Sequence, residues 1–172
     1  MLAGLWPFYF TRSELEPSIL LAEQILRLAP KAEDPALALM LGHNAQAGNY
    51  TVIGDCDRAL EHADQVIHIF DPRKHHSYVF QTGFHLKPVS TAWSVVELWF
   101  LGYPDQGRQR LKDALSFSHE SNHPSTLAFV FYWDAMFHQL SRDVQAVKNT
   151  VDEAVKLSTE YGLQLWICLL YT

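Results

Sequence analysis

Cysteine, glycine, proline and clustered basic residues are all scarce in this 172-residue sequence, which contains 2 Cys, 8 Gly and 8 Pro. Cys56 and Cys168 are too few for a disulfide framework and indicate a reducing compartment. The low glycine and proline content excludes collagen-like and low-complexity chains. Lys and Arg number 13 against 19 Asp and Glu, which gives a net charge of −6. Because phosphate binding needs a basic stripe, we expect neither nucleic acid nor an anionic membrane as partner.

Targeting signals and long apolar runs are also missing. The first residues have no basic segment and no small-residue cleavage site, and no stretch of about 18 uninterrupted apolar residues occurs. The nearest candidate, residues 89–103, is interrupted by Ser90, Thr91, Ser94 and Glu97, and this pattern predicts a buried helix. We therefore expect a cytoplasmic protein.

Helical periodicity runs through most of what is present. Val89, Ala92, Trp93 and Val96 follow the i, i+3, i+4, i+7 pattern, whereas no Asn-Gly or Asp-Gly hairpin signal exists. Candidate caps agree: Ser13 to Glu16 reads as a capping box, Asp34 precedes a proline, and Gly102 ends a helix. We predict an all-α chain with helices at 2–11, 14–29, 34–52, 55–70, 87–101, 104–120, 124–140, 143–161 and 163–172, and a long loop at 71–87.

An internal repeat organises these helices. Similar turns begin at Ser13, Gly54, Gly102 and Ser141, with spacings of 41, 48 and 39 residues. A period of about 40 with two helices per unit predicts antiparallel helical hairpins stacked into a right-handed α-solenoid superhelix. Small residues at the turns, Ala59, Gly107 and Ala146, would allow the two helices of each hairpin to approach closely. We expect one array over residues 1–172, with hairpins at 1–30, 34–70, 87–120 and 124–161 and a partial fifth unit at 163–172.

Several phrases give this array a more specific resemblance. Residues 101–106 (LGYPDQ) followed by Ala114 and Leu115, together with 123–129 (HPSTLAF), 163–166 (LQLW) and 70–77 (FDPRKHHS), resemble the tetratricopeptide (TPR) region of large bacterial regulators. In that family the repeats follow an adenylate/guanylate cyclase domain and an AAA-type ATPase domain. The resemblance implies a TPR-like superhelix, but this sequence contains neither enzymatic domain, so no activity transfers. One departure is Gly107, where the family usually has alanine; glycine is weaker in a helix by about 1 kcal/mol.

Histidine and cysteine offer the only hints of chemistry. His75, His76 and His85 share the 71–87 loop with Asp71, but zinc sites favour spaced Cys and His pairs, so packed or solvated histidines are the better interpretation. His119 and His123 straddle a helix break, which favours cap and loop roles.

Cys56 lies six residues before His62, which places the two on different faces of a helix and indicates an inert thiol. No nucleotide-binding loop, nucleophile elbow or zinc-protease motif occurs. We therefore predict no catalytic residue, no metal and no cofactor.

The repeat register indicates which side chains face the concave side of the superhelix. Positions five and eight residues before the turns are Asn49, Glu97, Met136, Gln46, Ser94 and Trp133. Trp133 and Met136 could equally be core residues. Asp134, inside an apolar helix, is expected to face a solvent-lined groove, with a buried polar role as the alternative.

These features predict a non-enzymatic module that binds a protein or peptide, as part of a larger signalling regulator. A sensor is the alternative: a small ligand or peptide would bind in the superhelix cavity, near Glu97 and Asp134. An enzyme using the histidine loop is a third, weaker candidate. Both ends of the sequence fall within apolar helices, 2–10 and 166–171, which predicts either self-association or continuation into a longer array.

Overall fold

A computed structural model describes residues 2–170, and every regular element within that range is a helix. The expected all-α class is therefore confirmed, although the last two residues of the expected helix 163–172 lie outside the described part. The long helices are α2 (Leu15–Leu28), α3 (Pro35–Ile53), α4 (Cys56–Ile69), α7 (Leu86–Phe100), α8 (Pro104–Ser121), α9 (Pro124–Leu140) and α10 (Val144–Glu160). Shorter helices are α1 (Trp6–Thr11) and α11 (Gln164–Leu170), with 3-10 turns at Leu2–Gly4 and Ala29–Lys31.

Local capping explains why most helix ends fall where the sequence indicates. The Asp34 carboxylate accepts the N–H of Leu37 at 3.0 Å, and Gly102 has φ +88°, the left-handed conformation that glycine adopts easily. The expected capping box at Ser13 is wrong. Ser13 has φ +59°, which turns the chain between α1 and α2, so Glu14 becomes the N-cap and makes no side-chain cap. A capping residue needs an extended backbone, and Ser13 does not have one.

Residues 71–87 are more ordered than the expected loop. They form α5 (Pro72–His75), a 3-10 turn (His76–Tyr78) and α6 (Val79–Thr82), ended by Gly83 at φ +76°. Asp71 starts this run because its side chain accepts the N–H of Arg73 at 2.9 Å. The segment is also anchored elsewhere: the Tyr78 hydroxyl donates to Asp34, and the His85 N–H donates to the Thr126 hydroxyl.

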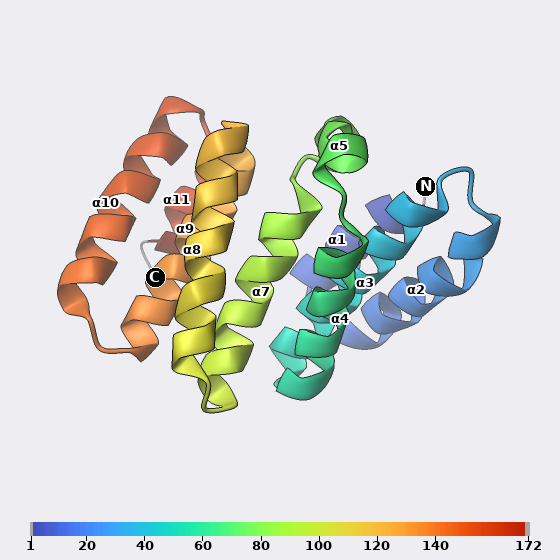
Figure 1. Cartoon of the computed structure of the whole chain (residues 1–172), viewed down its shortest axis with the longest axis horizontal. Helices are drawn as coiled ribbons and strands as arrows, with labels where there is room; N and C mark the ends of the chain where they lie inside the picture. Colours follow the sequence, from blue (N-terminus) through green and yellow to red (C-terminus); the bar gives the residue numbers. More distant parts are fainter. Residues whose placement is uncertain (1, 171–172) are drawn as a thin grey trace.

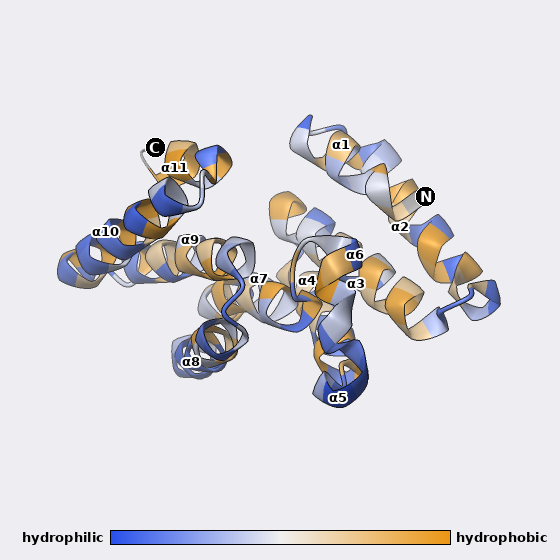
Figure 2. Ribbon diagram, turned by 90° about the horizontal axis from the view of Figure 1, so that it is seen from above, coloured by the Kyte–Doolittle hydropathy of each residue, from blue (hydrophilic) through white to orange (hydrophobic). Residues whose placement is uncertain are grey.

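The helices from α2 to α10 follow one another along the long axis of the molecule, and neighbours in sequence pack on one another (Figure 1). Pairs form between α3 and α4, α7 and α8, and α9 and α10, while α4 and α3 both contact α7, and α7 contacts α9. In Figure 2, α1 and α11 lie on the same side of α3, α7 and α9, and α8 lies on the opposite side of α7 and α9. We call the surface of α3, α7 and α9 that lies toward α1 and α11 the inner face.

Small residues lie where the two helices of a hairpin meet, and aromatic residues fill the space between hairpins. Ala59 and Gly107 are buried, and Ala146 is half-buried. A Cβ at Gly107 would lie 2.8 Å from the Val95 carbonyl oxygen, so α8 meets the backbone of α7 there. The largest buried cluster centres on aromatic side chains of α7 and α9. Within residues 2–170, no helix combines the length and apolarity that crossing a membrane requires.

Candidate functional site

The six predicted groove residues are buried and do not line one open groove. They are Gln46 and Asn49 on α3, Ser94 and Glu97 on α7, and Trp133 and Asp134 on α9. Each helix supplies two of them, but each pair has its own surroundings. Met136 alone among the register positions is half-buried, and it lines a groove between α9, α10 and α11.

The pair on α3 is covered by the first two helices. Asn49 Oδ1 accepts the Ser18 hydroxyl at 2.6 Å and the indole N–H of Trp6 at 3.1 Å. The Asn49 amide donates to Gln46 Oε1 at 3.3 Å, and Gln46 donates to the Ile19 carbonyl at 3.4 Å. Both amides therefore bind α1 and α2, so neither is presented to a partner in this conformation.

The pair on α7 is equally enclosed. The Ser94 hydroxyl donates to the Thr91 carbonyl one turn earlier at 2.7 Å. Burial raises the pKa of Glu97, an effect that the nearby Cys56 thiol only partly opposes. Burial, and next the Glu97 carboxylate, raise the pKa of Cys56 to about 12, so the thiol stays protonated at neutral pH. A thiolate is the nucleophilic form, and its absence agrees with an inert Cys56.

Asp134 is a correction to the expected solvent-facing carboxylate. Its side chain is buried between α9 and α10, where Oδ2 accepts the Thr150 hydroxyl at 2.5 Å and Oδ1 lies 3.2 Å from His138 Nε2. Burial raises the pKa of Asp134, while Thr150 and His138 lower it. The packing of α10 on α9 supplies the partners that a buried carboxylate needs, and so favours the alternative role.

Trp133 belongs to a row of aromatic rings that crosses the inner face. Ring centroids lie 6.0 Å apart for Phe10 and Trp93, 4.7 Å for Trp93 and Trp133, and 5.4 Å for Phe129 and Trp166. The row links α1, α7, α9 and α11. The indole N–H groups of Trp93 and Trp133 are buried and have no hydrogen-bond partner among the described residues. Two adjacent unpaired donors are unusual, because most buried polar groups are hydrogen-bonded.

Sequence reasoning assigned Trp93 to packing and missed its pairing with Trp133. A signal was present, because positions 93 and 133 are 40 residues apart, which equals the repeat period. The groove register counted eight residues back from each turn, and Trp93 lies nine residues before Gly102. Because of this one-residue offset, the count did not place Trp93 and Trp133 at the same position of the repeat.

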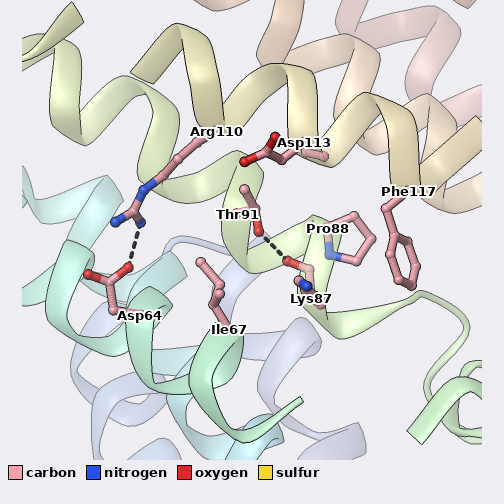
Figure 3. Close-up of a pocket in the computed structure, with 9 residues that line it drawn as sticks. Asp64, Ile67, Lys87, Pro88, Thr91, Arg110, Asp113 and Phe117 are labelled. Atoms are coloured by element: carbon pink, nitrogen blue, oxygen red, sulfur yellow. Dashed lines mark hydrogen bonds and ion pairs between the residues drawn. The ribbon is translucent and has the colours of Figure 1, made fainter. Parts of the chain in front are cut away.

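Two cavities are lined by none of the rings of Phe10, Trp93, Phe129, Trp133 and Trp166. The larger, about 560 Å³, is lined mainly by apolar side chains of α9, α10 and α11, including Met136 and Val147. The smaller, about 320 Å³, lies between α4, α7 and α8 (Figure 3). There Arg110 forms an ion pair with Asp64, with N and O 2.5 Å apart. Neither cavity is lined by Glu97 or Asp134.

The histidines pack against aromatic rings and one another. His85 is buried beside His76 and His123, with ring centroids 4.6 and 5.6 Å away, and burial, then these two neighbours, lower its pKa to about 4. His123 caps α9 by accepting the Thr126 N–H at 3.3 Å. His75 stacks on Tyr78. Among residues 2–170, no group of three or more His, Cys, Asp or Glu side chains has a geometry suited to a metal ion.

A second histidine pair was not foreseen. His43 on α3 and His62 on α4 place their Nδ1 atoms 2.9 Å apart, so one ring donates to the other. Burial and the neighbouring His62 lower the pKa of His43 to about 4. Tyr50 stacks on His62 and encloses the pair further.

No protein-family model matches the chain, and no curated protein and no solved structure gives a significant match.

Proposed function

We propose that this chain is a non-enzymatic interaction module that binds a peptide or partner helix on its inner face. We propose further that its helical hairpins form a TPR-like superhelix, part of a cytoplasmic signalling regulator. The packing order supports this reading, because α3 and α4 both contact α7, and α7 and α8 both contact α9. Aromatic side chains are also the residues that anchor most protein interfaces.

The paired indoles of Trp93 and Trp133 carry the proposal. A buried donor without a partner costs about 1–3 kcal/mol. An acceptor from a partner, such as a main-chain carbonyl or a carboxylate, would recover that energy for both donors. The rings lie 4.7 Å apart, so neighbouring acceptors of one peptide segment could serve both. The partner would therefore present apolar side chains beside two adjacent acceptors.

Selection of displayed peptides against the purified chain tests this function. Trp93→Phe and Trp133→Phe each keep an aromatic ring but remove the N–H, so each should weaken a selected peptide about ten-fold, equal to about 1.4 kcal/mol. Trp99→Phe is the matched control, because Trp99 packs beside Val95, Leu111 and Phe137, away from the aromatic row. The proposal fails if no peptide is selected, or if the control weakens binding as much as the other two variants.

A small-ligand sensor is the second candidate, favoured by the cavity in Figure 3. Its walls combine Lys87 and Arg110 with Asp64 and Asp113, and Phe117 adds an apolar surface. Two cations and two carboxylates suit a zwitterion of amino-acid size. Thermal stabilisation by amino acids or dipeptides, lost in Lys87→Met, would support this function over a peptide-binding inner face.

Self-association is proposed for the apolar groove of α9, α10 and α11. Val144 lines this groove and is 80% exposed. A mass that rises with concentration in light scattering, and falls in Val144→Glu, would support contact between copies. A constant monomer mass would exclude it.

A further inference from the structure

The helix α1 occupies the inner face in the way that a bound peptide would. Its Trp6 donates to Asn49 on α3, and its Phe10 lies edge-on to Trp93 on α7. A Cβ at Gly48 would lie 3.2 Å from the Trp93 ring and 3.3 Å from the Trp6 ring, so glycine makes room for both indoles. We call the surface formed by Gly48, Asn49 and Trp93 the α1 site.

The attachment of α1 is slight for a helix in this position. None of its six residues is buried, and it packs mainly on α2, the next helix in the chain. A helix of this length is not stable by itself in water. Ser13, with φ +59°, forms the turn on which α1 could swing away.

Removal of α1 leaves the polar groups beneath it satisfied. Asn49 Oδ1 keeps the Ser18 hydroxyl at 2.6 Å, and the Asn49 amide keeps Gln46 Oε1. Within residues 2–170, Trp6 makes the one hydrogen bond from an α1 side chain to another helix, and its half-buried indole can bond to water instead. Departure of α1 also removes Phe10 from the Trp93 ring, whose N–H has no partner in this conformation.

We propose that α1 is a displaceable intramolecular ligand, and that the α1 site binds a short helix carrying a tryptophan whose N–H reaches Asn49. This inference rests on the proposed function and specifies its partner class. The missing side chain of Gly48 leaves room for a flat aromatic ring, and the Asn49 side-chain carbonyl accepts a hydrogen bond, so the site favours a ring with an N–H. The partner additionally gains contact with Trp93, and α1 competes with it until displaced.

The first test measures opening of α1 without any partner. Hydrogen exchange followed by mass spectrometry should find the amides of residues 6–11 exchanging about 100-fold faster than those of α3, because α1 opens locally. Trp6→Ala should accelerate this exchange further. Phe8→Ala is the control, because Phe8 is 54% exposed and its ring interacts with Tyr9 and Arg12 of its own segment. Exchange of residues 6–11 at the rate of α3 would overturn the proposal.

The second test measures occupancy of the site. The probe is a fluorescein-labelled synthetic peptide of residues 5–12 (LWPFYFTR), read by anisotropy. It should bind Trp6→Ala about ten-fold more tightly than wild type or Phe8→Ala, because the internal competitor is weakened. The Phe10→Ala chain should also bind it more tightly. A peptide in which its tryptophan is replaced by 1-methyltryptophan should lose that gain.

The outcomes separate this inference from the proposed function. Equal probe affinity for wild type, Trp6→Ala and Phe10→Ala would overturn the inference. Library peptides that bind without accelerating exchange in residues 6–11 would overturn it too, while the inner face would still be a binding surface. If the library yields no peptide, the function fails, and the exchange and probe experiments still decide whether α1 is displaceable.

Discussion

Gly107→Ala is a sharp test of how closely α8 approaches α7. In an open helix this change would stabilise the protein by about 1 kcal/mol, because alanine has the better helix propensity. Here the new Cβ would lie 2.8 Å from the Val95 carbonyl oxygen and 3.2 Å from the Phe137 ring. The oxygen belongs to the backbone of α7, so it can retreat only if the two helices move apart.

The expected magnitude follows from these opposing effects. Overpacking of a rigid core costs about 1–3 kcal/mol, with the upper part of the range applying where backbone must move. After the propensity gain is subtracted, we expect a loss of about 1–2 kcal/mol in the free energy of unfolding. For a chain of this length that lowers Tm by roughly 2–8 °C.

Thermal unfolding by circular dichroism and urea titration would measure the change. Gly42→Ala is the matched control, because its Cβ would meet side-chain rather than backbone atoms: Leu26 Cδ2 at 2.6 Å, Leu26 Cγ at 2.7 Å and Ile25 Cγ2 at 3.3 Å. We expect Gly42→Ala to cost clearly less than Gly107→Ala. A Tm for Gly107→Ala equal to or above the wild-type value would refute the close approach of α7 and α8.

Three further predictions concern buried ionisable groups. The pKa of His43 falls from 6.5 to about 4 in the folded state, so the unfolded chain binds protons first and stability is lost as pH falls from about 6.5 to 4. The raised pKa of Asp134 acts in the opposite sense, so wild type must be compared with His43→Gln. Between pH 7 and pH 4.5, the urea midpoint should fall less in His43→Gln than in wild type. Asp134→Ala should cost about 2–3 kcal/mol by leaving Thr150 and His138 unpaired, whereas Asp134→Asn should cost about 1 kcal/mol; equal losses in urea titration would contradict the hydrogen-bonded role. Iodoacetamide at pH 7.5 should modify Cys56 far more slowly in the folded than in the urea-unfolded chain, and equal rates would argue against its raised pKa.

Local signals predicted the helices, and tertiary contacts decided where prediction failed. Asp34 and Gly102 act on residues within one turn, so their roles could be inferred from neighbouring sequence. Ser13 looked like a cap by the same rule, but the turn between α1 and α2 places its backbone in the left-handed region. The pairing of His43 with His62 joins residues 19 apart on facing helices, so it depends on how α3 and α4 are aligned.

The sequence indicated which helices carry the candidate residues, but not whether those residues are exposed. Counting back from each turn selected residues on α3, α7 and α9, among them Trp133. The count cannot say what covers those positions, and Asn49 lies beneath α1 because Trp6 can donate to it there. Asp134 was expected to face solvent because carboxylates are rarely buried, and its partner Thr150 lies on the next helix, 16 residues later.

The two ends of the inner face therefore differ in what they offer a partner. On α3, the amides of Gln46 and Asn49 are already bonded to α1 and α2, so a ligand must replace a contact before it gains one. On α7 and α9, the indoles of Trp93 and Trp133 have unpaired donors, so a new acceptor gains a bond without breaking another. Phe10 connects the two regions, because it extends from α1 onto Trp93. If α1 is displaceable as proposed, we expect a ligand that binds the indoles to shift Phe10 and so to weaken the hold of α1 on α3.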